Sequence, residues 1–287
     1  MDWPKISIAV PNYNGGERIG KALQSLLDQD YPDLEILVAD GGSTDDSVEV
    51  IRSFEPHLTW WCSEKDNGQT HAINKGLARA TGTVVNWLCS DDVLLPGALR
   101  TVGAYFAEHP DVDVVAGAGG IYDENNPEKS YIWRTEPRHL GLLPAHNGII
   151  QQSCFWRTSL HQRTPPLDES FHFSMDTELW CYFKTIGARW AFLPDILGRY
   201  IQTGENKQVV GGIKIAREYE RVYRLYTNDR ISLAFWYRTF RYPFERLLRR
   251  DRGLLRRGLL GIIQIVWMLV FLPFYGYGKV RYMSWPE

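Results

Sequence analysis

Two adjacent carboxylates, Asp91 and Asp92, follow an apolar run at residues 84–88. Neighbouring carboxylates repel each other, and both lose favourable hydration if a buried strand carries them into the protein. A divalent cation with oxygen ligands would offset both effects, so the pair predicts a metal site at the end of a strand. The alternative is an ordinary turn before a helix near Pro96, because Asp is common in strand-to-helix loops.

The same arrangement occurs twice upstream of this pair. An apolar run at residues 34–39 ends on Asp40, and the run at residues 6–10 ends on the polar loop 11–16. Two glycines follow Asp40 and provide a flexible turn before the start of a helix. In an open parallel sheet, nucleotides bind where the carboxyl ends of the strands meet. The polar loops therefore predict a nucleotide site at one edge of a sheet.

These runs belong to a regular alternation of apolar segments and helical patterns. The alternation is typical of an α/β fold with a mostly parallel sheet and helices on both faces. The expected strands cover residues 6–10, 34–40, 58–62, 84–88 and 112–116. The expected helices cover residues 18–28, 47–54, 70–80 and 96–109. Farther along we expect a turn at 123–127 between antiparallel strands, a strand over 149–156 and a helix from 175 to about 187.

Length and composition favour one domain with appended elements. The 287 residues are 44% hydrophobic and 13% aromatic, which is enough to bury a substantial core. The first residues lead directly into a strand without the apolar segment of a secretory signal, so we expect the catalytic part in the cytosol. The cysteines lack CxxC spacing, which favours reduced core residues over a zinc site or disulfides. They are Cys62, Cys89, Cys154 and Cys181.

The net charge of -2 hides an asymmetry along the chain. From Ala216 to the end there are 14 Lys and Arg against 6 Asp and Glu, whereas the rest has 18 basic and 28 acidic residues. An acidic body with a basic tail suggests a metal-dependent enzyme docked on an anionic surface. We expect lipid and no nucleic acid at that surface, because the arginines lack a nucleic-acid-binding signature and an apolar segment follows them.

The tail divides into three predicted segments. An amphipathic helix is expected over residues 214–226, and residues 235–257 carry eight arginines among aromatic and aliphatic side chains. Residues 258–278 contain no charge, but Pro273 shortens the uninterrupted helix to about 22 Å, and spanning a bilayer takes about 30 Å. Three alternatives stay open for this segment: an interfacial or re-entrant membrane helix, a spanning helix, and a soluble helix of the core or of an oligomer contact. In the first two cases, residues 235–278 would hold the chain at the cytoplasmic face of a membrane.

Six short motifs in these regions occur in the order known from one enzyme family. They lie at residues 11–14, 29–32, 39–45, 66–69 with 72–77, 90–92 and 175–180. With these motifs, residues 5–200 resemble the family 2 glycosyltransferases of the GT-A fold. The resemblance implies a Rossmann-like, mostly parallel sheet flanked by helices. It also implies a GT-A domain over 1–210, with a nucleotide-binding half at 1–116 and an acceptor-binding half at 117–210, before a helical extension at 211–287.

The resemblance assigns three acids to a nucleotide-diphosphate sugar. Asp40 would hold the nucleotide base through a hydrogen bond to its carboxylate. The alternative role for Asp40 is an Asx turn that opens the next helix. Asp91 would face the ribose, and Asp92 would bind Mg2+ or Mn2+ across the diphosphate of a UDP- or GDP-sugar. Further donor-binding positions are Pro11, Asn12, Tyr13, Asn74 and Lys75. Among these, Asn74 would hold the Asp40 loop and Lys75 would approach the phosphates.

On the acceptor side, Asp176 matches the general base of the family. A carboxylate there would take the proton of the acceptor hydroxyl and invert the anomeric configuration; the alternative is a helix N-cap. Many GT-A enzymes complete the metal shell with a His, but no His follows His172, so water would complete it here. Residues expected near the acceptor are Gln151, Gln152, Trp133, Trp156 and Trp180. The tryptophans would stack on sugar rings; the alternative is that they are buried in the hydrophobic core.

The motifs together predict an inverting glycosyltransferase. It would move a sugar from a nucleotide-diphosphate sugar to a saccharide or lipid-linked saccharide, in the assembly of cell-surface polysaccharide or other glycans. One alternative is a sugar-phosphate nucleotidyltransferase, but the loop at residues 11–16 lacks the basic residue that such an enzyme normally carries. The other alternative is a non-catalytic, membrane-bound adaptor with the same fold, against which the presence of all three acids argues.

Overall fold

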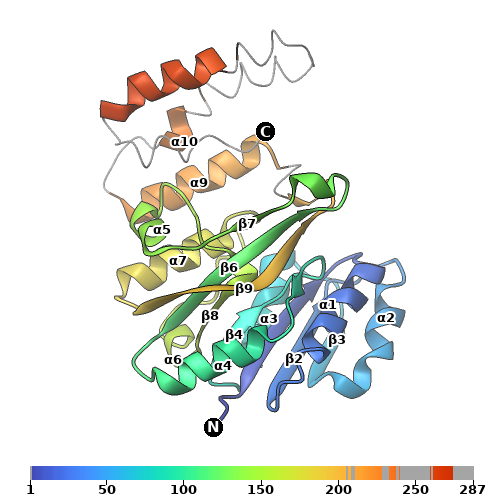
Figure 1. Cartoon of the computed structure of the whole chain (residues 1–287). Helices are drawn as coiled ribbons and strands as arrows, with labels where there is room; N and C mark the ends of the chain where they lie inside the picture. The colour runs from blue at the N-terminus through green and yellow to red at the C-terminus, as the bar shows by residue number, and fades with distance from the viewer. Residues whose placement is uncertain are drawn as a thin grey trace.

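The computed structural model describes residues 2–204, 206–207, 211–227, 233–236, 239, 259 and 261–273. Within these ranges, nine strands form one sheet in the order β3-β2-β1-β4-β8-β6-β9-β5, and β7 pairs with β6 beside that path (Figure 1). The strands are β1 (Ile6–Asn12), β2 (Leu34–Asp40), β3 (Trp60–Ser63), β4 (Val84–Trp87), β5 (Val93–Leu94), β6 (Val114–Asp123), β7 (Tyr131–Trp133), β8 (Cys154–Arg157) and β9 (Trp190–Gln202).

Helices cover both faces of this sheet and continue beyond it. They are α1 (Glu17–Leu27), α2 (Ser47–Ser53), α3 (Gln69–Leu77), α4 (Ala98–Glu108), α5 (Pro137–Leu142), α6 (Thr158–His161), α7 (Met175–Thr185), α9 (Ile213–Tyr226) and α10 (Leu233–Trp236). Residues 261–273 are also helical. Short 3₁₀ turns occur at Glu55–His57, Pro127–Lys129 and Gln151–Ser153.

The first half of the sheet is parallel, as predicted. β2 and β4 both pair with β1, and β3 pairs with β2. The register places Asn12 beside Asp40 and Asp40 beside Ser63, so three strand ends meet at one edge. The α/β fold class is confirmed. The sheet is mixed beyond β4, because β8 lies between β4 and β6 and runs antiparallel to both.

Expected and observed elements agree where the apolar runs are uninterrupted. Strands β1 to β4 match the predicted ranges within two residues at each end, and the turn at 123–127 joins antiparallel β6 and β7 as expected. β8 is shorter than the predicted strand over 149–156, because residues 151–153 form a 3₁₀ turn. β9 has no predicted counterpart, since Pro194 and Gly198 interrupt its apolar pattern.

Side chains of the central strands alternate between two hydrophobic layers. In β1, Ile8 packs in one layer and Ala9 in the other, and Val84 and Val85 of β4 divide in the same way. This two-residue period is that of a strand buried on both faces. Helices α1, α2 and α4 cover the first layer, and α3, α6 and α7 cover the second. The layers fix the strands and so hold their polar ends in place.

An aromatic cluster fills the centre of the second layer. Trp156 and Trp180 are completely buried, with ring centroids 5.6 Å apart. Trp87 lies against Trp156 at 5.5 Å, and Trp190 lies against Trp180 at 5.8 Å. The expectation that Trp156 and Trp180 stack on an acceptor sugar is therefore wrong, because neither ring has an exposed face. Their aromatic and apolar surface stabilises the core instead.

The helices after β9 pack on one another in series. α9 contacts α7 and contributes Val222 to the second hydrophobic layer. α10 contacts α9, and the ring of Trp236 lies 5.5 Å from that of Phe271 in the helix at 261–273. In Figure 1 these helices extend progressively away from the sheet. The proposed boundary after residue 210 stays a prediction, although α9 shares the core of the sheet domain.

Part of the expected apolar run at residues 258–278 lies in the helix at 261–273. Within the part of the chain that the structure describes, none of the helices combines the length and the hydropathy needed to cross a bilayer. Most of the arginine-rich segment 235–257 and residues 258, 260 and 274–278 of the expected apolar run lie outside the described residues.

Replacing Trp156 with Ala should lower the free energy of unfolding by about 3–5 kcal/mol, because a fully buried aromatic side chain leaves a cavity. Urea denaturation followed by circular dichroism measures the loss. The control is Tyr13→Ala, since Tyr13 is 64% exposed; it should cost less than about 0.5 kcal/mol. Equal losses in the two variants would contradict the core assignment of Trp156.

Candidate active site

Side-chain hydrogen bonds join the ends of β1 and β2. Asn12 Nδ2 donates to Asp40 Oδ1 at 2.7 Å, and the amide of Asn14 donates to Ser43 Oγ at 2.8 Å. The amide of Thr44 donates to Asn14 Oδ1 at 2.9 Å. The loops after two neighbouring parallel strands thus form one connected rim at the edge of the sheet where nucleotides bind in this class of fold.

Asp40 is completely buried, and both of its carboxylate oxygens accept hydrogen bonds. Oδ2 accepts from the amides of Gly42 and Ser43 and from Ser63 Oγ, at 2.6–3.2 Å. Burial alone would raise the pKa of Asp40, but the hydrogen bonds from Ser43, Ser63 and Asn12 outweigh it and lower that pKa. Asp40 therefore organises the loop after β2 through an Asx turn. Contact with a nucleotide base stays a prediction.

Cys89, Asp91 and Asp92 lie together after β4. The sulfur and the carboxylate oxygens are within 4.8 Å of one another, a spacing that one cation can bridge. Asp92 is 4% exposed, and its Oδ1 accepts a hydrogen bond from the amide of Ile201 at 3.2 Å. Burial and the neighbouring Asp91 carboxylate raise the pKa of Asp92 well above its usual range. A bound cation would favour the charged form of Asp92 and reverse this shift.

Tyr200 of β9 lies close enough to these acids for their charges to affect its hydroxyl. The hydroxyl of Tyr200 is buried and, among the described residues, has no hydrogen-bond partner. Burial, together with the charges of Asp92 and Asp91, raises the pKa of Tyr200 above its usual range, so the phenol stays neutral. The carboxylates of Asp91 and Asp92 are hard oxygen ligands of the kind that Mg2+ and Mn2+ prefer. No sequence pattern pointed to Tyr200, because β9 itself has no clear strand signal.

The segment after β9 and the start of α3 close around the same acids. Asn206 Nδ2 donates to Asp91 Oδ2 at 2.9 Å. Gln69 Nε2 donates to Cys89 Sγ at 3.1 Å, and Lys207 Nζ donates to Gln69 Oε1 at 3.0 Å. All four cysteines are free, as expected, but Cys89 belongs to this polar cluster. Cys89 also packs against the second hydrophobic layer, so it lies at the border between that core and the polar cluster.

Two predicted donor residues on α3 contact the protein itself. Asn74 Nδ2 donates to the carbonyl of Leu167 at 2.9 Å, and the amide of Leu167 donates to Asn74 Oδ1 at 3.0 Å. The expectation that Asn74 holds the Asp40 loop is wrong, because both amide atoms bind a segment before α7. Lys75 Nζ pairs with Glu64 Oε1 at 2.9 Å. Contact between Lys75 and a phosphate stays a prediction.

Asp176 lies in the first turn of α7. Asn147 Nδ2 donates to its Oδ2 at 3.0 Å, and the amide of Thr177 donates to its Oδ1 at 2.6 Å. Burial raises the pKa of Asp176 to about 6, although these hydrogen bonds oppose the shift. The carboxylate is thus ionised at neutral pH and still basic enough to accept a proton. The N-cap of α7 is Ser174, so the helix-cap alternative for Asp176 does not hold.

Glu218 of α9 fixes the segment that leads into α7. Its Oε1 accepts a hydrogen bond from the amide of His172 at 2.9 Å, and its Oε2 accepts from the amides of Phe173 and Ser174 at 2.8 and 3.1 Å. Charge-assisted hydrogen bonds of this kind are stronger than neutral ones. They tie the start of the helix that carries Asp176 to α9. Nothing in the sequence pointed to Glu218, since its partners lie more than forty residues away.

Two glutamines expected near the acceptor brace β4. Gln151 Nε2 donates to Asn86 Oδ1 at 2.9 Å and to the carbonyl of Trp87 at 2.8 Å. Gln152 is 4% exposed, and its side chain packs closely against Gly198 of β9. The carbonyl of Gln152 also accepts a hydrogen bond from Asn86 Nδ2 of β4 at 3.4 Å. Gln151 therefore holds β4 through its side chain, and Gln152 holds it through its backbone. Contact between either glutamine and an acceptor stays a prediction.

The remaining predicted contacts differ in their exposure. Pro11 and Asn12 are buried, whereas Tyr13 projects from the same loop and is 64% exposed. Trp133 is half-buried, and its Nε1 donates to the carbonyl of Gly148 at 2.9 Å. Tyr13 and Trp133 thus keep surface that a ligand can reach. Their roles at the donor and the acceptor stay predictions.

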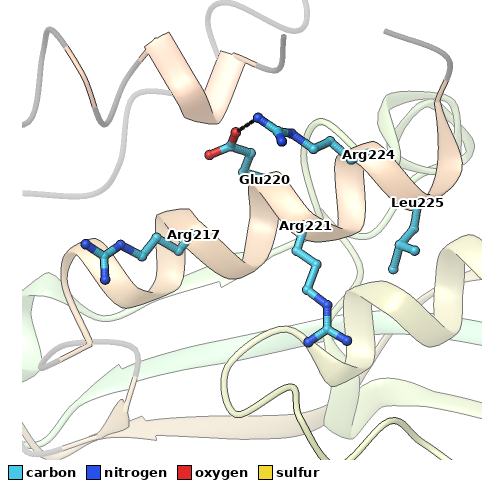
Figure 2. A pocket seen from close by; sticks show the side chains of 5 residues that line it. All are labelled: Arg217, Glu220, Arg221, Arg224 and Leu225. Carbon is cyan, nitrogen blue, oxygen red and sulfur yellow. Dashed lines mark hydrogen bonds and ion pairs between the residues drawn. The ribbon is translucent and has the colours of Figure 1, made fainter. Parts of the chain in front are cut away.

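A hollow of about 410 Å³ lies on the surface of α9. Figure 2 shows its lining, which consists of Arg217, Glu220, Arg221, Arg224 and Leu225. Arg224 pairs with Glu220, and Arg221 pairs with Asp168 at 2.6 Å. The hollow shares no lining residue with the cluster of Cys89, Asp91 and Asp92. Its volume is therefore no reason to place the donor there.

A family comparison bears directly on this arrangement. The model of glycosyl transferase family 2 matches residues 7–164, more than half of the chain. The chain belongs to glycosyl transferase family 2. The resemblance drawn from the motifs is thereby confirmed. The matched part of this family 2 chain includes Asp40, Asp91 and Asp92 and ends before Asp176.

Curated relatives match parts of this family 2 protein. An uncharacterized glycosyltransferase of Rickettsia prowazekii is 26% identical over 192 residues, which cover 64% of this chain and 60% of the relative. The GalNAc(5)-diNAcBac-PP-undecaprenol beta-1,3-glucosyltransferase of Campylobacter jejuni is 36% identical over 103 residues, which cover 34% of this chain and 33% of that enzyme. The chain thus spans 60% of the Rickettsia prowazekii relative and 33% of the Campylobacter jejuni enzyme.

Solved structures share the fold of this family 2 protein. The mannosyltransferase PcManGT from Pyrobaculum calidifontis, in complex with GDP-Man and Mn2+, has a TM-score of 0.61 at 18% identity and covers 98% of this chain and 85% of that chain. S. aureus TarS 1-349 in complex with UDP has a TM-score of 0.57 at 17% identity and covers 96% and 89%. At these identities the likeness shows the fold alone, and it confirms the GT-A class.

Replacing Glu218 with Ala should loosen the start of α7, because three backbone amides lose their acceptor. We expect faster hydrogen exchange at residues 172–174 and a loss of about 2–4 kcal/mol in the free energy of unfolding. Arg217→Ala is the matched control, because Arg217 is an exposed residue on the same helix. Unchanged protection of residues 172–174 in the Glu218 variant would contradict the link between α9 and α7.

Proposed function

We propose that this family 2 protein is an inverting glycosyltransferase that uses a nucleotide-diphosphate sugar. The burial of Asp92 beside Asp91 at the nucleotide edge of the sheet is the observation that carries this proposal. An uncompensated carboxylate pair is unfavourable there, and a cation that bridges a diphosphate would compensate it. Asp176, with its pKa of about 6, is the candidate base.

Mg2+ or Mn2+ is the cofactor that fits these ligands. Asp92 would hold the cation, with Tyr200 supplying a neutral oxygen beside it. The bound cation would neutralise the charge that develops on the departing nucleoside diphosphate. Asn206 holds one carboxylate oxygen of Asp91, which leaves the other oxygen to accept a hydrogen bond from the ribose.

Asp176 would remove the proton of the acceptor hydroxyl. Its carboxylate is oriented by Asn147 and Thr177, and Glu218 fixes the helix start that carries it. The hydroxyl oxygen would then attack the anomeric carbon from the face opposite the nucleotide, so the configuration at that carbon inverts. Proton removal by a positioned base of matched pKa typically accelerates such a step by about 10²–10⁴-fold.

The substrates proposed here draw support from similar proteins. Structural neighbours were solved with UDP, with UDP-GlcNAc and with GDP-Man and Mn2+. These titles support a UDP- or GDP-sugar as the donor. The Campylobacter jejuni relative is named for an undecaprenol diphosphate substrate. We infer a saccharide or lipid-linked saccharide as acceptor, in cell-surface polysaccharide or glycan assembly at the cytoplasmic face of the membrane.

Thermal unfolding separates this proposal from its alternatives. A ligand that binds only the folded chain at free concentration c stabilises it by RT ln(1 + c/Kd), so its Tm rises with the logarithm of the ligand concentration once that exceeds Kd. A glycosyltransferase should show a Tm increase with UDP or GDP that depends on Mg2+ or Mn2+. A non-catalytic adaptor should show none. A nucleotidyltransferase should form a nucleotide-sugar from a sugar phosphate and a nucleoside triphosphate, which the proposed enzyme should not.

Asp92→Asn should abolish transfer from the nucleotide-sugar and the metal-dependent Tm increase with UDP or GDP, because the amide is a poor ligand for a hard dication. A coupled assay for released nucleoside diphosphate measures transfer. Asp28→Asn, an exposed position at the end of α1, is the control and should leave both readouts unchanged. Metal-dependent turnover that survives in the Asp92 variant would overturn the assignment.

Activity should fall as the pH is lowered through about 6, because protonated Asp176 cannot accept the acceptor proton. Asn147→Ala removes a hydrogen bond that favours the charged carboxylate. We expect the acidic limb of kcat/KM to move up by about one pH unit in this variant. Asp176→Asn should lose transfer while keeping the Tm increase with UDP or GDP. An acidic limb at the same pH with and without Asn147 would contradict Asp176 as the base.

A further inference from the structure

The helix at residues 261–273 carries apolar side chains on its outer face. Five of them form the outer stripe, and their exposed fractions are 58% for Ile262, 60% for Ile265, 52% for Val266, 69% for Leu269 and 49% for Val270. Their spacing of three and four residues aligns them along one side of the helix. A contiguous apolar face of this kind on a folded protein marks a surface that something else covers.

The inner face of the same helix contacts the protein. Trp267 is 4% exposed, and its ring centroid lies 4.4 Å from that of Phe271, which in turn contacts Trp236 of α10. Gln264 is half-buried on this inner face, with its Oε1 buried. A helix on a water-exposed surface has the opposite arrangement, with polar residues outward. The outer stripe is thus entirely apolar, whereas the inner face includes the polar Gln264.

The two sides of the helix decide how it can meet a membrane. One side packs on α10 through Phe271, and the opposite side carries the outer stripe. A helix that is held by protein on one side and apolar on the other fits along the boundary between headgroups and acyl chains, with the apolar side in the lipid.

Charge distinguishes lipid from a second copy of the chain as the occupant. Eight arginines at residues 235–257 precede the helix, and Lys279 and Arg281 follow it. Two copies packed through the outer stripe would bring two strongly basic tails together, which is electrostatically unfavourable. Anionic lipid headgroups would instead attract these residues. We propose that the outer stripe lies in the interfacial layer of an anionic membrane, with the helix parallel to the surface.

This placement has a consequence for the acceptor, which rests on the proposed function. α7 contacts α9, α9 contacts α10, and α10 contacts the helix at 261–273 (Figure 1). The helix that carries Asp176 therefore lies between the sheet and the membrane-facing helix. A lipid-linked acceptor held in the same membrane would approach the base from that side.

Flotation of the full chain with vesicles tests the membrane contact without any assay of transfer. The chain should float with vesicles that contain phosphatidylglycerol, less with pure phosphatidylcholine, and less at high salt. Ile265→Glu with Leu269→Glu should reduce flotation by at least about tenfold, because two exposed apolar side chains no longer enter the lipid. Ile132→Glu, on a residue of β7 that is 52% exposed, is the control and should float like the unchanged chain.

Circular dichroism and the Tm increase with UDP show whether each variant is folded; if the glutamate variant is not, Ile265→Ser with Leu269→Ser replaces it in the same comparison. Failure of the unchanged chain to float, or equal flotation of the stripe variant, would overturn the membrane contact. A vesicle-free dimer that the stripe variant splits would assign the stripe to a second copy and also overturn it. If the unchanged chain floats with the vesicles but transfers no sugar, the result would instead count against the proposed function.

Discussion

A carboxylate buried beside another carboxylate is the constraint on which the site depends. Asp92 is almost completely enclosed, and the charge of Asp91 adds to the desolvation that raises its pKa. The folded chain keeps the pair because β4 is fixed in a two-layer core and Gln151 holds the end of that strand. Because the strand is fixed, the two carboxylates stay close together, and a bound cation would relieve their repulsion.

The second half of the chain packs against the acids that follow β4. β9 brings the amide of Ile201 to Asp92, and the charges of Asp92 and Asp91 raise the pKa of Tyr200 on the same strand. α7 carries Asp176, and Glu218 links the start of α7 to α9. The helix packed beyond α9 and α10 exposes its apolar face. Asp176, the second hydrophobic layer and the exposed apolar face of the helix at 261–273 therefore belong to one packed series of helices.

Local patterns were sufficient to predict the first half of the fold. Apolar runs that end on Asp40 and Asp92 specify strands and their polar ends together, and the structure brings both acids to one edge. Contacts set by distant packing were not predictable in this way. Asn74 binds Leu167, and Trp156 is enclosed by other aromatic rings, although both had been assigned to ligands. Tyr200 and Glu218 gave no local signal, because their partners are remote in sequence.

Diffraction from crystals grown with Mn2+ and UDP would test the proposed donor site most directly. The anomalous signal of manganese locates the cation independently of any assumption about the ligand. The expected result is a manganese peak between a carboxylate oxygen of Asp92 and the diphosphate, with the nucleotide along the ends of β1, β2 and β4. A manganese ion and nucleotide bound elsewhere, with Asp91 and Asp92 free of both, would contradict the proposed donor site.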